Sequence, residues 1–231
     1  LNIMLTKRGQ HKGKDIPMCG VPFHSAESYI KTLLDKNMKV AICEQLETPK
    51  EAKKRGYKEI VKRDVVRIIT PGTKLEESFL VQKENNILMA LFFFDNTWAS
   101  CWIDISTGLF KSTITNESQL LSLIDQISPK ETISYANKEE LSILKSYSPI
   151  EITWLESKKN FSRDIVIDHL SSFFDPERLQ KLGTGLLGSI SLLVEYLKKN
   201  KNLFLDHFDI PEQVELSNIM TIDPSTRKNL E

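Results

Sequence analysis

The residues best suited to chemistry are concentrated near the start of the chain. The segment LTKRGQHKGK, residues 5–14, holds five basic side chains within eight positions: Lys7, Arg8, His11, Lys12 and Lys14. Cationic groups this close together suit the phosphates of a nucleic acid, and the two intervening glycines would let backbone amides approach such a ligand. The pattern predicts a basic loop that contacts a polyanion. An ordinary solvated surface loop is the alternative interpretation.

A second unusual segment follows directly, IPMCGVPFHSAESYIKTLL, residues 16–34. Pro17 and Pro22 flank a short, mostly uncharged loop, and prolines restrict the shapes that such a loop can adopt. After it, apolar residues recur at spacings of three and four, which predicts a helix over residues 25–36 that ends at Asn37. A stiff loop beside a basic one suits a surface that lies against nucleic acid. A plain connection between a strand and a helix is the alternative.

Nucleotide binding by a phosphate loop is disfavoured. The run GQHKGKD resembles such a loop, but its spacing is one residue short, and Asp15 stands where a hydroxyl should bind magnesium. Pro17 also blocks the helix that should follow. The run GTGLLGS contains no lysine, and we interpret it as a break between two helices.

Metal-dependent catalysis finds equally little support. The four histidines, at positions 11, 24, 169 and 207, have no paired spacing typical of metal ligands. A nuclease would need several carboxylates around its metal ions, and the relevant strands offer only Asp95 in a turn and Asp104 at a strand end. A metal-dependent nuclease stays open as one alternative function, and a module that binds only protein is another.

Composition and charge narrow the remaining classes. The 231 residues are 40% hydrophobic and 27% charged, as in ordinary globular proteins. The net charge of zero hides an asymmetry, because residues 1–75 hold 16 Lys and Arg against 8 Asp and Glu, whereas residues 76–231 hold 15 against 23. Three scattered cysteines and the absence of a long apolar run favour the cytoplasm. The basic first part is therefore the candidate for binding a polyanion.

Hydrophobic patterns divide the chain into two modules. In the first, strands are expected over MKVAICEQ and over Asp64–Thr70, joined by the charged loop EAKKRGYKE and followed by a turn at Pro71 and Gly72. In the second, three strand runs follow one another closely: Ile87–Phe94, Trp98–Ile105 and Leu109–Thr115. Their short turns predict an antiparallel meander.

Helices and strands then alternate. Helices are expected over 117–127, 138–145, 162–174 and 186–199, with strands over ETISYA and IEITWLE between the first three. Alternation of this kind adds parallel strands to a sheet. The predicted fold class is α/β: a small mixed α/β module followed by a module with the strand and helix order of the ribonuclease H-like fold, a mixed sheet with flanking helices.

Five runs, taken together, resemble the MutS family of bacterial DNA mismatch-recognition proteins. They are LTKRG, IPMCGVPFHSAESYI, VAICEQ, VVRIITPGT and the terminal DPSTRKNLE, and the resemblance covers the whole chain. It implies a mismatch-binding domain over residues 1–75 that lacks its first segment, a linker over 76–84, a ribonuclease H-like connector domain without nuclease activity over 85–203, and the start of a core or lever domain over 204–231. The chain is accordingly expected to be a fragment of a longer protein.

The resemblance also implies site residues, all of them for binding DNA. Contacts to the DNA backbone are expected from Thr6, Lys7, Arg8, His11 and Lys12. A loop that approaches the minor groove beside the mispaired base is expected from Met18, Cys19, Gly20, Pro22 and His24. Cys19 stands where the family usually has alanine. The family's Phe-x-Glu motif would lie upstream of LTKRG, and no Phe-x-Glu occurs in this chain.

The implied activity is DNA mismatch repair. The family's proteins recognise mispaired or unpaired bases as homodimers, transmit this through the connector to an ATPase, and recruit MutL. The ATPase site, with ATP or ADP and magnesium, would lie beyond Glu231, so the resemblance implies no catalytic residue, cofactor or metal in this chain.

Overall fold

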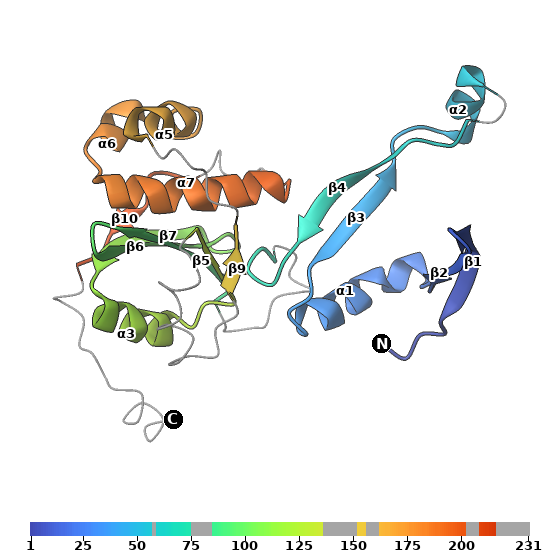
Figure 1. Ribbon diagram of the computed structural model, residues 1–231, viewed down its shortest axis with the longest axis horizontal. Helices are drawn as coiled ribbons and strands as arrows, with labels where there is room; N and C mark the ends of the chain where they lie inside the picture. The colour runs from blue at the N-terminus through green and yellow to red at the C-terminus, as the bar shows by residue number, and fades with distance from the viewer. Residues whose placement is uncertain (57–58, 75–84, 136–151, 156–161, 202–207, 216–231) are drawn as a thin grey trace.

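A computed structural model describes the chain except for residues 57–58, 75–84, 136–151, 156–161, 202–207 and 216–231. Two parts are visible in Figure 1. The first part extends from the second as a long two-stranded ribbon, with a hairpin and a helix beside it. The second part is a layered α/β module, in which helices lie above and below one sheet.

The basic segment near the start is a β-hairpin and not the loop expected from sequence. Strand β1 (Thr6–His11) pairs antiparallel with β2 (Lys14–Met18). The turn between them consists of Lys12 and Gly13, both with positive φ (50° and 76°), as in the type I′ turns whose twist matches paired strands. A register shift between Lys7 and Gln10 accommodates Gly9 at φ 69°.

The helix expected after the proline loop is present but shorter. A single 3₁₀ turn, η1 (Phe23–Ser25), leads into α1 (Ala26–Leu34). Asn37 follows with φ 57°, which confirms the predicted left-handed stop.

The ribbon consists of β3 (Val40–Gln45) and β4 (Arg63–Ile69), which are antiparallel. At its far end the predicted charged loop EAKKRGYKE is wrong over residues 51–55, because α2 (Pro49–Arg55) forms there. The side chain of Thr48 accepts a hydrogen bond from the backbone of Glu51, whose carboxylate accepts one from the backbone of Thr48 in return. This reciprocal cap, with Pro49 at the first helical position, explains why a helix starts here.

The first part has only a small apolar core at the base of the ribbon. Leu34 and Ile69 are fully buried there, with three partly buried side chains around them, Ile30, Val40 and Ile42. Burying an aliphatic side chain contributes about 1.5–3 kcal/mol, whereas ordering one residue costs about 1–2 kcal/mol of backbone entropy. This core cannot by itself stabilise the hairpin, α1 and the ribbon.

The second part is built on a six-stranded mixed sheet with the strand order β10-β7-β6-β5-β8-β9. Its strands are β5 (Ile87–Phe94), β6 (Thr97–Asp104), β7 (Leu109–Thr115), β8 (Glu131–Ser134), β9 (Ile152–Trp154) and β10 (Glu212–Gln213). The first three form the predicted antiparallel meander, and β8, β9 and β10 add in parallel. The turn between β5 and β6 has Asp95 and Asn96 at positive φ, which again fits type I′.

Helices cover both faces of this sheet. Alternate residues of β5 point to opposite sides, so that Leu88 and Ala90 pack with α7 (Thr184–Lys199), and Met89 and Leu91 pack with α3 (Glu117–Ile127). Helices α5 (Arg163–Leu170) and α6 (Pro176–Gln180) lie on the outer side of α7 (Figure 1). The mixed α/β sheet with flanking helices confirms the predicted fold class.

The interpretation of GTGLLGS as a helix break is wrong. Helix α7 starts at Thr184, so most of this run lies inside the helix, where Gly185 and Gly188 allow close packing. A Cβ at position 188 would lie 2.5 Å from the ring of Phe92. The break occurs instead at residues 181–183, between α6 and α7.

Other boundaries differ from the sequence-based expectations. Helix α5 ends at Leu170 and not at Phe174, and neither α6 nor β10 was expected. The helix expected over 138–145 falls outside the described residues.

Candidate nucleic-acid interface

Hairpin β1–β2 presents its basic side chains to solvent. Every residue of both strands is exposed. Within the described part of the chain, the side chains of Arg8, His11, Lys12 and Lys14 make no hydrogen bond or ion pair. Such groups can exchange counterions for phosphates without first breaking an internal contact.

Lys7 differs from these because it is already paired. Its Nζ lies 2.7 Å from Oδ2 of Asp15 on the neighbouring strand, and the side chain of Gln10 donates to the other carboxylate oxygen at 3.0 Å. The hydrogen bond from Lys7, followed by that from Gln10, lowers the pKa of Asp15. Sequence reasoning noted Asp15 only as a defect in a phosphate loop, and missed that it neutralises Lys7.

Thr6 closes the open end of the hairpin. Its hydroxyl donates to the carbonyl oxygen of Met18 at 2.7 Å, across from its strand partner. The hydroxyl hydrogen is therefore engaged within the chain, and a phosphate, which needs a donor, would have to displace this bond.

The proline loop places apolar and small residues on the surface. Pro22 (φ −60°) accepts a hydrogen bond through its carbonyl from the amide of Ser25, which closes η1. Cys19, Gly20, Pro22 and His24 are exposed, Met18 is 40% exposed, and Phe23, which sequence reasoning did not select, is 97% exposed. His24 lies inside η1 and makes no side-chain cap. Exposed apolar side chains beside cationic ones suit contact with base edges in a widened minor groove.

Helix α2 adds a second basic group that sequence reasoning missed. Lys50, Lys53 and Lys54 are exposed, have no partner among the described residues, and share one helix face because they are spaced by three and four. The run TPKEAKK carries the signal, since a Thr-x-x-Glu cap followed by lysines predicts a basic helix.

Arg55, the next cation of α2, is engaged. Its guanidinium pairs with the carboxylate of Glu47 and, at 3.4 Å, with that of Glu59. Glu47 also accepts from the backbone amide of Lys62 at 2.7 Å, and this bond, together with Arg55, lowers the pKa of Glu47. These contacts attach α2 to the segment that leads into β4, and they hold its three free lysines at the end of the ribbon.

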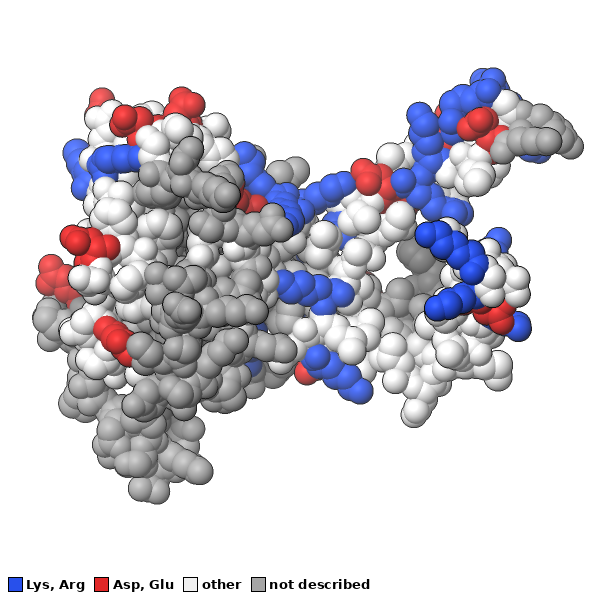
Figure 2. All heavy atoms as spheres, viewed as in Figure 1, with Lys and Arg blue, Asp and Glu red and all other residues white. Residues whose placement is uncertain are grey.

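The two basic groups lie at the same end of the molecule. Figure 2 shows Lys and Arg gathered over α2 and over the hairpin, away from the six-stranded module. On the face shown, the acidic side chains of the second part lie toward the opposite end. The predicted charge asymmetry therefore corresponds to a spatial separation.

The carboxylates considered for a nuclease site are used structurally or isolated. Asp104 is 1% exposed and accepts hydrogen bonds from the amides of Asn86 and Ser106 and from the Ser106 hydroxyl, whereas Asp95 lies in the β5–β6 turn. Within the described ranges, no group of three or more His, Cys, Asp or Glu could hold a metal ion. Among the same residues, no helix combines the length and apolarity needed to cross a membrane.

Comparison with known proteins identifies the family. The sequence matches the family models described as MutS domain I, over residues 1–78, and MutS domain II, over residues 86–209. Curated relatives that cover the whole chain include proteins named DNA mismatch repair protein MutS from Wolbachia pipientis wMel (41% identical), Ehrlichia chaffeensis strain Arkansas (42%) and Rhizobium meliloti (38%). The chain spans 28%, 29% and 26% of their respective lengths. With matches to two successive MutS domains across most of its length, the chain belongs to the MutS family.

Proposed function

We propose that this chain binds duplex DNA that contains mispaired or unpaired bases, as part of DNA mismatch repair. The observation that carries this is the group of free cations on the hairpin and on α2, at one end of the molecule. Phosphate contacts from both groups would supply affinity without sequence preference. The exposed loop Met18–His24 would lie between the backbone contacts and approach the bases.

Within this proposal the predicted contact residues differ in whether they must break an internal contact before they bind DNA. Arg8, His11 and Lys12 are free to contact phosphates, whereas Lys7 must first leave Asp15 and Thr6 must leave the Met18 carbonyl. Met18, Cys19, Gly20, Pro22 and His24 remain the proposed groove-side residues, to which we add Phe23. Lys50, Lys53 and Lys54 join the backbone contacts.

The six-stranded module would be the connector. Following the family resemblance, it would transmit DNA binding to an ATPase that uses ATP or ADP with magnesium, and would contribute to recruiting MutL by a cytoplasmic MutS homodimer. The proposed boundaries are residues 1–75 for the mismatch-binding domain, 76–84 for the linker, 85–203 for the connector and 204–231 for the start of the next domain. In this arrangement the chain itself performs no catalysis.

Fluorescence anisotropy with labelled duplexes tests DNA binding directly. Paired and G·T-mispaired duplexes are titrated at several salt concentrations, and the slope of log affinity against log salt is expected to be about −5 if the hairpin and α2 together neutralise about six phosphates. Met18→Ala should leave this slope unchanged, because its side chain carries no charge. A slope near zero, or no binding to either duplex at low salt, would refute the proposal.

Incubation of the same duplexes with magnesium or manganese separates the alternative activities. Intact DNA is expected throughout. Metal-dependent cleavage with turnover would favour the ribonuclease H-like nuclease. Binding of an acidic protein without binding of DNA would favour the protein-interaction module.

A further inference from the structure

A buried carboxylate lies where the ribbon meets the connector sheet. Glu131, the first residue of β8, is only 5% exposed. It accepts hydrogen bonds from groups on four separate segments: the Tyr196 hydroxyl at 2.5 Å, the Gly72 amide at 3.3 Å, the Thr153 hydroxyl at 3.4 Å and, as an ion pair, Lys39 Nζ at 3.1 Å. Two of these donors belong to the connector and two to the chain segments that flank the base of the ribbon, one before β3 and one after β4.

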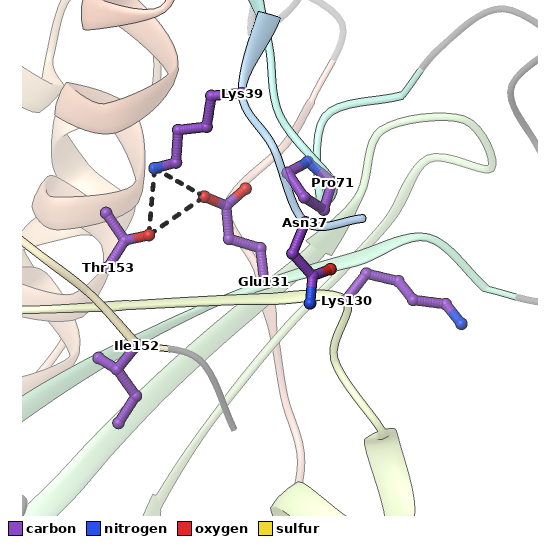
Figure 3. Close-up of a pocket in the computed structure, with 7 residues that line it drawn as sticks. All are labelled: Asn37, Lys39, Pro71, Lys130, Glu131, Ile152 and Thr153. Carbon is purple, nitrogen blue, oxygen red and sulfur yellow. Dashed lines mark hydrogen bonds and ion pairs between the residues drawn. The ribbon is translucent and has the colours of Figure 1, made fainter. Parts of the chain in front are cut away.

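Lys39 contributes from the first part of the protein. It directly precedes β3, and its ammonium group also donates to the Tyr196 hydroxyl at 2.8 Å and to the Thr153 hydroxyl at 3.1 Å. The same group lies 5.1 Å from the centre of the Tyr196 ring. Figure 3 shows Lys39 and Thr153 converging on Glu131, at a polar cavity of about 210 Å³ that Pro71 and Asn37 also line.

Gly72, on the chain that leaves β4 at the same end of the ribbon, lies against the same carboxylate. A Cβ at this position would lie 2.9 Å from Cβ of Glu131 and 3.2 Å from that of Leu88, so only glycine allows this approach. Thr70 and Thr73 on either side are completely buried and bonded to each other. The chain leaving β4 is thus packed directly on β5 and β8.

A second, exposed attachment lies further along β4. The amide of Ile68 donates to the carbonyl of Asn200 at 3.1 Å, and Lys201 Nζ pairs with Asp64 at 3.1 Å. Both Asn200 and Lys201 follow the end of α7. Because this ion pair is largely solvated, it contributes little compared with the pair at Glu131.

We propose that Glu131 is a positioning residue that fixes the orientation of the ribbon, and with it the basic end of the molecule, on the connector. A buried carboxylate requires its donors, because an ionised group without partners is strongly destabilised away from water. Moving the ribbon would withdraw Lys39 and the Gly72 amide together. Burial and the neighbouring Glu131 charge also raise the pKa of Tyr196, which therefore remains a hydroxyl donor. The orientation itself does not depend on DNA; only its consequence for DNA binding rests on the proposed function.

A distance measurement across the joint tests this inference in the whole chain. In a Cys19→Ser background, spin labels are placed on exposed Cys43 in β3 and on Gln126→Cys at the exposed side of α3, while Cys101 is buried. Double electron–electron resonance then gives the distribution of distances between the two parts, without DNA. A single narrow distribution is expected for the otherwise unaltered chain.

The decisive variants alter the ion pair from each side. Lys39→Met and Glu131→Gln are each expected to broaden the distribution at least twofold, whereas Lys39→Arg, which keeps the charge, should keep it narrow. Lys7→Met, which breaks an ion pair inside the hairpin, is the matched control and should leave the distribution of distances unchanged. Asp64→Asn, at the exposed attachment, should broaden the distribution less than Lys39→Met.

A narrow distribution in both Lys39→Met and Glu131→Gln would overturn the inference, as would equal broadening by Lys39→Met and Lys39→Arg. If circular dichroism shows that Glu131→Gln unfolds the connector, the comparison of Lys39→Met with Lys39→Arg decides alone, because Lys39 lies outside the sheet. If the distances responded to the variants as expected but the unaltered chain bound no DNA, only the proposed function would be contradicted.

Discussion

Replacing the three free lysines of α2 by glutamine should weaken DNA binding in a salt-dependent way. Lys50, Lys53 and Lys54 share one exposed face and have no partner among the described residues, so each can neutralise about one phosphate. Losing three such contacts should flatten the slope of log affinity against log salt by about 2.7, at about 0.9 per phosphate. Over a fourfold rise in salt, this changes the ratio of the two affinities by roughly 40-fold.

The assay is the anisotropy titration at salt concentrations between about 50 and 200 mM, the range over which such slopes are well resolved. The affinity deficit of the triple variant should be largest at the lowest salt and about 40-fold smaller at the highest. A charge-matched control replaces Lys181, Lys198 and Lys199, three exposed lysines of the connector, by glutamine. If both triple variants flatten the slope equally, general charge and not the position of α2 governs binding, and the assignment of α2 to the interface is refuted.

Three further predictions concern the hairpin, the connector core and the ribbon tip. Asp15→Asn should tighten DNA binding and steepen the salt slope by up to about 0.9, because Lys7 loses its internal partner; an unchanged slope in the same titration would show that Lys7 does not reach phosphate. Gly188→Ala should lower the free energy of unfolding by about 1–3 kcal/mol through overpacking against Phe92, partly offset by about 1 kcal/mol of helix propensity. Chemical denaturation should show that this loss disappears in a Phe92→Leu background. A loss that persists there would place the clash elsewhere. Folding lowers the pKa values of Glu47, Glu51 and Asp64, so these carboxylates stabilise the fold above their ordinary pKa values, and this effect is lost as the pH falls through the lowered values. Near pH 3 the backbone amides of α2 should therefore exchange their hydrogens before those of β5 and β6. Simultaneous exchange would contradict this prediction.

Local signals in the sequence were sufficient for the centre of the connector. The meander follows from apolar strands joined by turns such as Asp95–Asn96, and α3 follows from its apolar spacing. These elements depend on residues close together in sequence, which is why their pattern alone predicts them. The basic character of the first 75 residues was equally visible, because charge needs no knowledge of the fold.

Long-range contacts decided what the sequence could not. Gly188 was interpreted as a helix breaker because its partner, the ring of Phe92, is almost a hundred residues away in the chain. The pairing of Lys7 with Asp15 depends on a cross-strand register and a bulge, neither of which a charge count contains. The donors around Glu131 come from four segments and are brought together only by the folded joint. Helix α2, in contrast, had a local signal in Thr48 and Glu51 that was overlooked among its charges.

The small core of the first part has a consequence for how the protein is made. On the ribosome, residues 1–74 emerge before the groups that anchor the ribbon, Glu131, Tyr196 and Asn200. At about 5–20 residues per second, roughly ten seconds separate Ile69 from Asn200. During that interval the exposed apolar side chains Met4, Leu5 and Phe23 belong to a segment whose anchoring groups have not yet been synthesised. The hairpin, α1 and the ribbon should therefore reach their folded arrangement only after α7 has been translated.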